Sequence, residues 1–211
     1  MRVALSDALN RYGQVMSYFL PWDEVNPYRP EFAAIVRDSD PYRLTQLAWD
    51  HANKTDTINR LLACDIKLYL PGDLLPKVDI TTMAVSLEAR NRLLDQHLMK
   101  WAASLPGDLK VNHGITKYLF KKALEPWLPS NLIHRNRMGF EIPRDEWLRG
   151  PLQPMVHDLL CSSDTRIATY LEPEKVSRWV TSHEQYGNAR ARVWALLMLE
   201  LWHRVVQEVR V

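Results

Sequence analysis

Residues 189–209 read ARARVWALLMLELWHRVVQEV, and this stretch does most to decide the fold class. Its apolar residues cover most of the circumference of an α-helix. A narrow polar strip contains Arg192, Glu200, His203 and Gln207. We therefore expect a long final helix that runs through the core of a mainly α-helical chain.

The rest of the chain also favours helices, because it lacks sustained apolar–polar alternation between Asn-Gly or Asp-Gly turns. Capping residues and prolines indicate where the helices begin. The expected starts are Ser6, the neighbourhood of Pro41, Asp56, Asp73, Asp95, Thr116, Pro151, Glu172 and Asn188. The dipeptide Pro71-Gly72 should end the helix that begins at Asp56, and the following helix should reach about Leu87.

Length and composition are those of an ordinary soluble globular protein, with 211 residues, 46% hydrophobic and 25% charged. No internal repeat or domain boundary stands out, so we expect a single helical domain over residues 1–211. Wide aromatic rings usually pack between helices. The core is therefore expected to include Trp101, Trp127, Trp147, Trp179, Trp194 and Trp202.

Charge and cysteine usage exclude several classes of partner. The net charge of +2 is too small for the electrostatic footprint of a nucleic-acid-binding or membrane-binding surface, so neither partner is expected. Cys64 and Cys161 stand far apart without metal-ligand spacing, which favours a reducing cytoplasm. The longest apolar run, 193–199, is too short to span a bilayer. A cytoplasmic protein without a targeting segment is expected.

Familiar catalytic motifs cannot be built from this sequence. Its seven glycines include no GxGxxG fingerprint and no GxxxxGK loop, so this chain has no phosphate-cradling loop of its own. Its histidines form no HExxH pair, and no acidic loop has calcium spacing, so no metal site is expected.

Three places nevertheless carry more charge than a helix exterior requires. In the first, Lys77, Asp79, Glu88, Arg90 and Asp95 stand among apolar residues. Buried charges need partners or a ligand, so this group is either a set of structural ion pairs or part of a site.

The second and third places lie close together in the sequence. Lys117 stands at the start of an expected helix, where it is either a solvated lysine or an anion site. The loop over 134–145 contains Arg137. Between Lys110 and Arg149, eight Lys or Arg face four Asp or Glu, so positive charge is concentrated there. This region could neutralise a pyrophosphate or could simply be an exposed, solubilising loop.

In this order, the three places resemble the carboxy-terminal half of the synthetase domain of glutamine-hydrolysing asparagine synthase. The resemblance rests on LPGDLLPKVDITTMAVSLEARNRLLD, GITKYLFKKAL, RNRMGFEIPRDEWLRGPL and WALLMLELWHR, and it is strongest over 70–204. It implies a helical part of an α/β synthetase domain of the PP-loop, adenine-nucleotide alpha-hydrolase-like type. It also implies ATP and Mg²⁺ as cofactors and amidation of aspartate through an acyl-adenylate.

Residue roles follow from the same resemblance. Lys117 matches a lysine that holds pyrophosphate and stabilises developing charge, and Glu88 and Arg90 match a pair that orients substrate. Lys77, Asp79 and Asp95 match charged positions that we interpret as support for that pair. Arg137 stands where the family has a lysine in its basic loop.

The departures leave the substrate open. Ile80 replaces a family arginine, and Arg92-Leu93 replaces Pro-Phe, so a different carboxylate is possible, as in β-lactam synthetases or lasso-peptide cyclases. The chain also lacks the family's amino-terminal cysteine, its Ser-Gly-Gly-x-Asp-Ser loop for ATP and its Ser-Gly-Glu-Gly-x-Asp-Glu segment. The sequence thus predicts part of a synthetase that is inactive alone, either a truncated reading frame or a subunit completed by a partner carrying the nucleotide-binding half. The alternative is a non-catalytic helical binding module.

Overall fold

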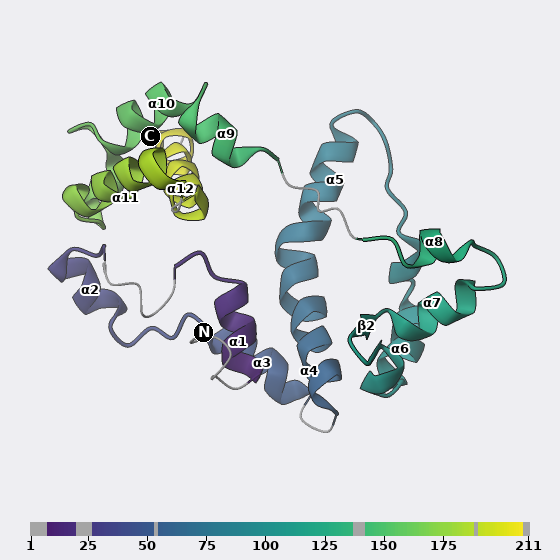
Figure 1. Cartoon of the computed structure of the whole chain (residues 1–211). Helices are drawn as coiled ribbons and strands as arrows, with labels where there is room; N and C mark the ends of the chain where they lie inside the picture. The colour runs from purple at the N-terminus through teal and green to yellow at the C-terminus, as the bar shows by residue number, and fades with distance from the viewer. Residues whose placement is uncertain (1–7, 20–26, 53–54, 137–141, 188–189, 209–211) are drawn as a thin grey trace. The chain divides into compact units, whose positions relative to one another are not determined.

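A computed structural model describes residues 8–19, 27–52, 55–136, 142–187 and 190–208 (Figure 1). The chain divides into two compact units, each assembled from two sequence segments. Unit 1 comprises Met1–Val15 and Asp40–Arg137, and unit 2 comprises Met16–Ser39 and Met138–Val211. Helices dominate both units, which confirms the mainly α expectation. The expectation of a single domain over 1–211 is not tested by this division and stays a prediction.

Unit 1 consists of short helices and one small hairpin. Its elements are α1 (Ala8–Val15), α3 (Arg43–His51), α4 (Thr57–Cys64), the π-helix η2 (Asp65–Leu74), α5 (Leu75–Met83), the 3₁₀ turn η3 (Arg92–Leu94), α6 (Gln96–Ser104), the 3₁₀ turn η4 (Gly107–Leu109), β1 (Val111–Asn112), β2 (Ile115–Thr116), α7 (Tyr118–Leu124) and α8 (Ser130–Ile133). Asp56 and Asp95 accept backbone N–H groups at the starts of α4 and α6, so both predicted caps are confirmed.

The helix that Asp56 begins does not end at Pro71-Gly72. Helices α4, η2 and α5 follow one another without a break, and Figure 1 shows them as one rod. A proline in an α-helix clashes with the carbonyl four residues earlier. Pro71 lies in η2, where the backbone has the wider π pattern, as the hydrogen bond from the Leu75 amide to the Leu70 carbonyl, five residues earlier, shows. The rod ends at Met83, four residues before the expected Leu87, and Ser86 has a φ of 58°.

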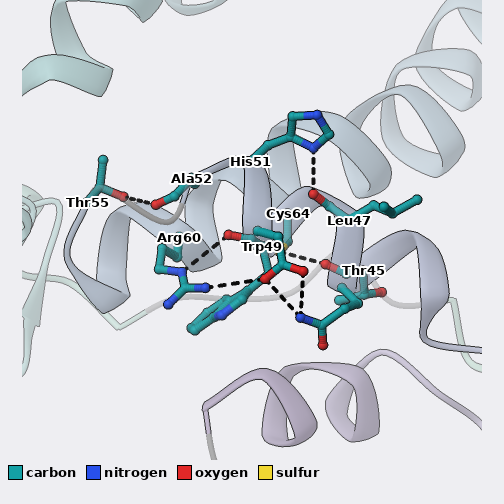
Figure 2. A network of polar contacts seen from close by, with 10 residues as sticks. Thr45, Leu47, Trp49, His51, Ala52, Thr55, Arg60 and Cys64 are labelled. Atoms are coloured by element: carbon teal, nitrogen blue, oxygen red, sulfur yellow. Dashed lines mark hydrogen bonds and ion pairs between the residues drawn. The ribbon is translucent and has the colours of Figure 1, made fainter.

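Helices α3 and α4 are joined by a polar clamp around Arg60 (Figure 2). The Arg60 guanidinium lies 4.0 Å from the centre of the Trp49 ring, and its Nε donates to the Trp49 carbonyl at 3.2 Å. A second guanidinium nitrogen lies 3.7 Å from the Asp50 carboxylate. Beneath this clamp, Cys64 is fully buried, and burial raises the pKa of its thiol.

Unit 2 contains the hydrophobic core. Its helices are α2 (Pro30–Val36), α9 (Arg144–Arg149), α10 (Gln153–Leu160), the 3₁₀ turn η5 (Arg166–Thr169), α11 (Pro173–Tyr186) and α12 (Arg190–Glu208). Pro173 occupies the first turn of α11, as its fixed φ favours. The core cluster consists of Leu148, Val156, Leu160, Ile167, Leu171, Val176, Trp179, Val180, Val193, Leu196 and Leu197.

Helix α12 directs part of its polar strip into the core of unit 2. Glu200 is completely buried and His203 is only 6% exposed, so part of the strip faces the core. On the other side, Met198, Trp202 and Val205 are exposed. The helix is therefore buried along one face rather than running through the core. None of the helices in the described ranges is long and apolar enough to cross a membrane.

Unit 1 buries much less apolar surface than unit 2. Among its described residues, the buried hydrophobic ones are Ala48 and Cys64. Trp101 and Trp127 are 55% and 80% exposed, so the expectation that they belong to the core is wrong, as it is for Trp202 at 51%. Of the six tryptophans assigned to the core, Trp179 is buried and Trp194 packs against the core cluster.

Candidate functional site

Lys117 lies between the hairpin and helix α7. Strands β1 and β2 pair Val111 with Thr116 across a two-residue turn, His113-Gly114, in which both residues have positive φ. Lys117 follows as the N-cap of α7 with a left-handed backbone, φ 57° and ψ 36°. For a residue other than glycine this conformation costs about 1–2 kcal/mol. The expected lysine at a helix start is confirmed, although the helix begins at Tyr118 rather than Thr116.

The Lys117 side chain is exposed to solvent. In the part of the chain that the structure describes, no ion pair engages its ammonium group. Lys122, on the same helix, instead forms an ion pair of 2.9 Å with Glu125. Lys117 is therefore a cation that an approaching anion could meet without breaking an existing ion pair.

Glu88 and Arg90 form a bidentate ion pair on the surface. The Arg90 Nε donates to Glu88 Oε1 at 3.0 Å, and a terminal nitrogen donates to Oε2 at 3.2 Å. The Arg90 side chain is 81% exposed and the Glu88 side chain is 69% exposed, so the pair contributes little to stability. Neither charge is buried, contrary to one premise of the sequence argument. The geometry matches the bidentate way in which arginine holds carboxylates.

The three supporting residues, in the described part of the chain, form no hydrogen bond or ion pair with Glu88 or Arg90. Lys77 pairs with Asp73 at 3.3 Å, one turn earlier in the same rod, and Asp79 is exposed. The Asp95 carboxylate accepts the His97 and Leu98 amides and so caps α6. Among the described residues, no hydrogen bond or ion pair joins Lys117 to Lys77, Asp79, Glu88, Arg90 or Asp95. All six belong to unit 1. Arg137 lies outside the described residues.

Sequence reasoning missed a polar cluster beneath the hairpin. It consists of Asp56, Asn59, Gly107 and Lys110, and it ties η4 to the start of α4. The hydrogen bond from the Asn59 amide and a further one from the Gly107 amide lower the pKa of Asp56. Burial lowers the pKa of Lys110, whose ammonium donates to the Asn59 side-chain oxygen. Only the cap at Asp56 was predicted from the sequence, because Gly107 and Lys110 each lie 51 residues from the partner they contact.

A metal centre is not evident in unit 1. In the described ranges, no three His, Cys, Asp or Glu side chains come together to hold an ion. The described residues thus offer a free cation at Lys117 and a paired carboxylate and guanidinium at Glu88 and Arg90. This set could bind an anion and orient a small charged substrate.

Comparison with known proteins identifies, over nearly the whole chain, the same family that the sequence motifs resemble. The asparagine synthase family pattern matches residues 3–204, so the match also includes the sequence before residue 70. Asparagine synthetase (glutamine-hydrolysing) 1 of Bacillus subtilis strain 168 is 31% identical over 169 residues, covering 79% of this chain and 26% of that protein. A putative asparagine synthetase (glutamine-hydrolysing) of Mycobacterium tuberculosis strain H37Rv is 32% identical over 172 residues, covering 76% and 26% respectively.

The chain thus spans about a quarter of the length of these curated relatives. No solved structure matches the chain. The family pattern covers residues 3–204, nearly the whole chain, and positions 88, 90 and 117 lie within this range. On this ground the chain belongs to the asparagine synthase family.

Proposed function

We propose that this chain contributes the carboxy-terminal part of an ATP-dependent, amide-forming synthetase site whose substrate is aspartate. The observation that carries the proposal is Lys117, an exposed cation without an ion pair in the described part of a chain that belongs to the asparagine synthase family. Its ammonium would neutralise the charge that develops on departing pyrophosphate when the carboxylate is activated. Glu88 and Arg90 would orient the substrate through their exposed carboxylate and guanidinium groups.

Among the described residues, no three His, Cys, Asp or Glu side chains come together to hold a metal ion. We therefore assign no metal-dependent step to this chain. ATP would supply the adenylyl group that activates the carboxylate, with pyrophosphate as the leaving group, when it is bound by the rest of the synthetase. The role of this chain is limited to charge neutralisation at Lys117 and to substrate orientation, with Lys77, Asp79, Asp95 and Arg137 as supporting positions.

The remainder of the site comes from sequence that this chain does not contain, in the same polypeptide or in a partner. Two observations support this arrangement. The chain corresponds to 26% of each of the two relatives, and unit 1 leaves large apolar side chains such as Ile80, Trp101 and Trp127 exposed. Exposed apolar surface of this kind marks an interaction site. The nucleotide-binding half of the synthetase is the proposed occupant, and the cytoplasm is the proposed location.

The test is aspartate-dependent exchange between ATP and pyrophosphate by the chain mixed with a nucleotide-binding half from a relative. Lys117→Ala should reduce the exchange rate by about a hundredfold or more, since it removes charge stabilisation in the transition state. Lys122→Ala, on the same helix, is the matched control and should retain the wild-type rate. Equal rates for wild type and Lys117→Ala would refute the assigned role.

The same assay separates the other two functions. A panel of carboxylates would identify a related ligase, because exchange would then depend on a substrate other than aspartate. Binding to the nucleotide-binding half without exchange for any carboxylate would favour the helical binding module. The exposed apolar residues of unit 1 are the observation that keeps this second candidate in view.

A further inference from the structure

Asp56 has two structural roles. Its Oδ1 accepts the Asn59 amide at 2.9 Å, which caps α4. Its Oδ2 accepts the Gly107 amide, also at 2.9 Å, from a turn 51 residues further along the chain. One carboxylate therefore serves both the start of a helix and the anchoring of a distant turn.

Gly107 fits this contact because it has no side chain. A Cβ atom at this position would lie 2.8 Å from Asp56 Cγ and 2.9 Å from Ile58 Cβ, closer than such atoms approach. Asn59 strengthens the same junction, since its side-chain nitrogen donates to Asp56 Oδ2 at 2.8 Å and to the Leu105 carbonyl at 2.9 Å. The turn over 105–107 is thus bonded to the start of α4 by two side chains, those of Asp56 and Asn59.

The backbone continues this connection to Lys117. The Lys110 amide donates to the Gly107 carbonyl at 2.9 Å, and the Lys110 carbonyl accepts the Tyr118 amide at 3.0 Å. Tyr118 is the neighbour of Lys117 and the first residue of α7. Lys117 itself has a left-handed backbone, which persists only where the surroundings hold it.

We propose that Asp56 is a positioning residue for Lys117, acting through the Gly107 amide and the Lys110 carbonyl to hold the start of α7 in place. The inference rests on the proposed function, since it matters to catalysis only if Lys117 meets the developing charge. A cap alone would require only one oxygen at Asp56. The second oxygen is what connects α4 to the segment that carries Lys117.

Asp56→Ser separates the two roles. Serine is as good an N-cap as aspartate, but its shorter side chain carries one oxygen, which cannot occupy the positions of both Asp56 Oδ1 and Oδ2. It can cap the Asn59 amide, and the Gly107 amide then loses its acceptor. Asp40→Asn is the matched control, because Asp40 accepts the Tyr42 amide near α3 and is not linked to the hairpin. Gly107→Ala is a second variant that retains the carboxylate and displaces the turn.

The first measurement, NMR spectroscopy of the full chain, does not depend on activity. In Asp56→Ser and Gly107→Ala, the Lys117 shifts and couplings that report its left-handed backbone should change, and the Tyr118 amide should exchange about five- to tenfold faster. The Asn59 amide should keep its wild-type exchange rate in Asp56→Ser, and Asp40→Asn should leave Lys117 and Tyr118 unchanged. Wild-type signals for Lys117 and Tyr118 in both test variants would overturn the inference.

The second measurement is ATP–pyrophosphate exchange with the nucleotide-binding half. Asp56→Ser should lower kcat about tenfold and leave the KM for aspartate unchanged, because a displaced Lys117 weakens transition-state rather than substrate binding. A wild-type kcat in a variant whose Lys117 signals have moved would overturn the catalytic part of the inference. If the wild-type chain showed no exchange, the proposed function would fail while the NMR result still decided the structural link.

Discussion

The carboxylate of Glu200 accepts a hydrogen bond of 2.9 Å from the backbone amide of Ile167. The same carboxylate accepts the Arg166 amide at 3.1 Å and the Thr165 hydroxyl at 3.2 Å, so the first residues of η5 are fixed to α12. Arg204, one turn later on α12, supplies a charged donor at 2.6 Å. Glu200, which the sequence places in a narrow polar strip, is therefore a buried hydrogen-bond acceptor of unit 2.

Glu200→Ala should destabilise the protein by about 3 kcal/mol, because buried donors at Thr165 and Ile167 would lose their acceptor. Urea unfolding followed by circular dichroism measures the loss. Glu174→Ala is the control, since Glu174 is an exposed glutamate of the same unit and its removal should cost less than about 1 kcal/mol. Equal unfolding midpoints for the two variants would show that the Glu200 network adds no stability.

The stability of unit 2 should depend on acid pH through Glu200. Burial opposes its charge, but the hydrogen bonds from Arg166, Ile167, Arg204 and Thr165 outweigh that effect and lower the pKa of Glu200. A lowered folded-state pKa means that the stabilisation is complete above about pH 4.5, the unfolded value, and is lost as pH falls through the folded one.

Glu200→Gln should therefore lose less stability than the wild type when urea unfolding is compared at pH 6 and at pH values below about 4.5. Other carboxylates contribute equally to both proteins, so the difference between the two pH profiles isolates Glu200. Parallel profiles would assign the acid sensitivity to those other groups.

Arg60→Lys should weaken unit 1 by about 1 kcal/mol, because lysine lacks the planar guanidinium that stacks on Trp49 while donating to its carbonyl. The hydrogen-exchange rates of the α4 amides measure this loss. Arg43→Lys, an exposed position on α3, provides the comparison and should not alter those rates. Identical rates in the two variants would exclude a stabilising clamp.

The two units should differ in hydrogen exchange. Amides of α10 and α12 lie on the core cluster, whereas α5 contains no buried residue. In the chain alone, we expect amides of α10 and α12 to exchange at least about tenfold more slowly than those of α5. Addition of the nucleotide-binding half should then slow amide exchange in α5 and leave α10 and α12 unchanged. If amides of α5 in the chain alone exchanged as slowly as those of α10 and α12, the proposed docking surface would be contradicted.

Much of the helical fold could be predicted because its signals are local. Asp56 and Asp95 cap the helices they were expected to cap, and Pro173 begins α11. These features depend on a residue and its next few neighbours. The hairpin of β1 and β2 was missed for a related reason, since two-residue strands are too short to show alternation.

The candidate site was predictable in its residue types and order but not in its geometry. Lys117 occupies a helix start as expected, yet its left-handed backbone, φ 57° and ψ 36°, could not be predicted from the sequence. Glu88 and Arg90 were expected to need a partner because of burial, and they pair on the surface instead. Charge patterns reveal which groups can interact, whereas exposure depends on what the rest of the fold covers.

The sequence by itself determined the helical class, the starts of α4, α6 and α11, and the family, because capping residues, proline geometry and ordered motifs depend on short stretches of sequence. The expected starts at Ser6 and Asn188 lie outside the described residues, and the one at Asp73 lies within the continuous rod. Only the tertiary structure decided that α12 turns Glu200 inward, that the rod continues past Pro71, and that Trp101 and Trp127 stay exposed. The direction in which a helix face is buried depends on segments distant in sequence. Ile167 lies 33 residues from Glu200, and Gly107 lies 51 residues from Asp56.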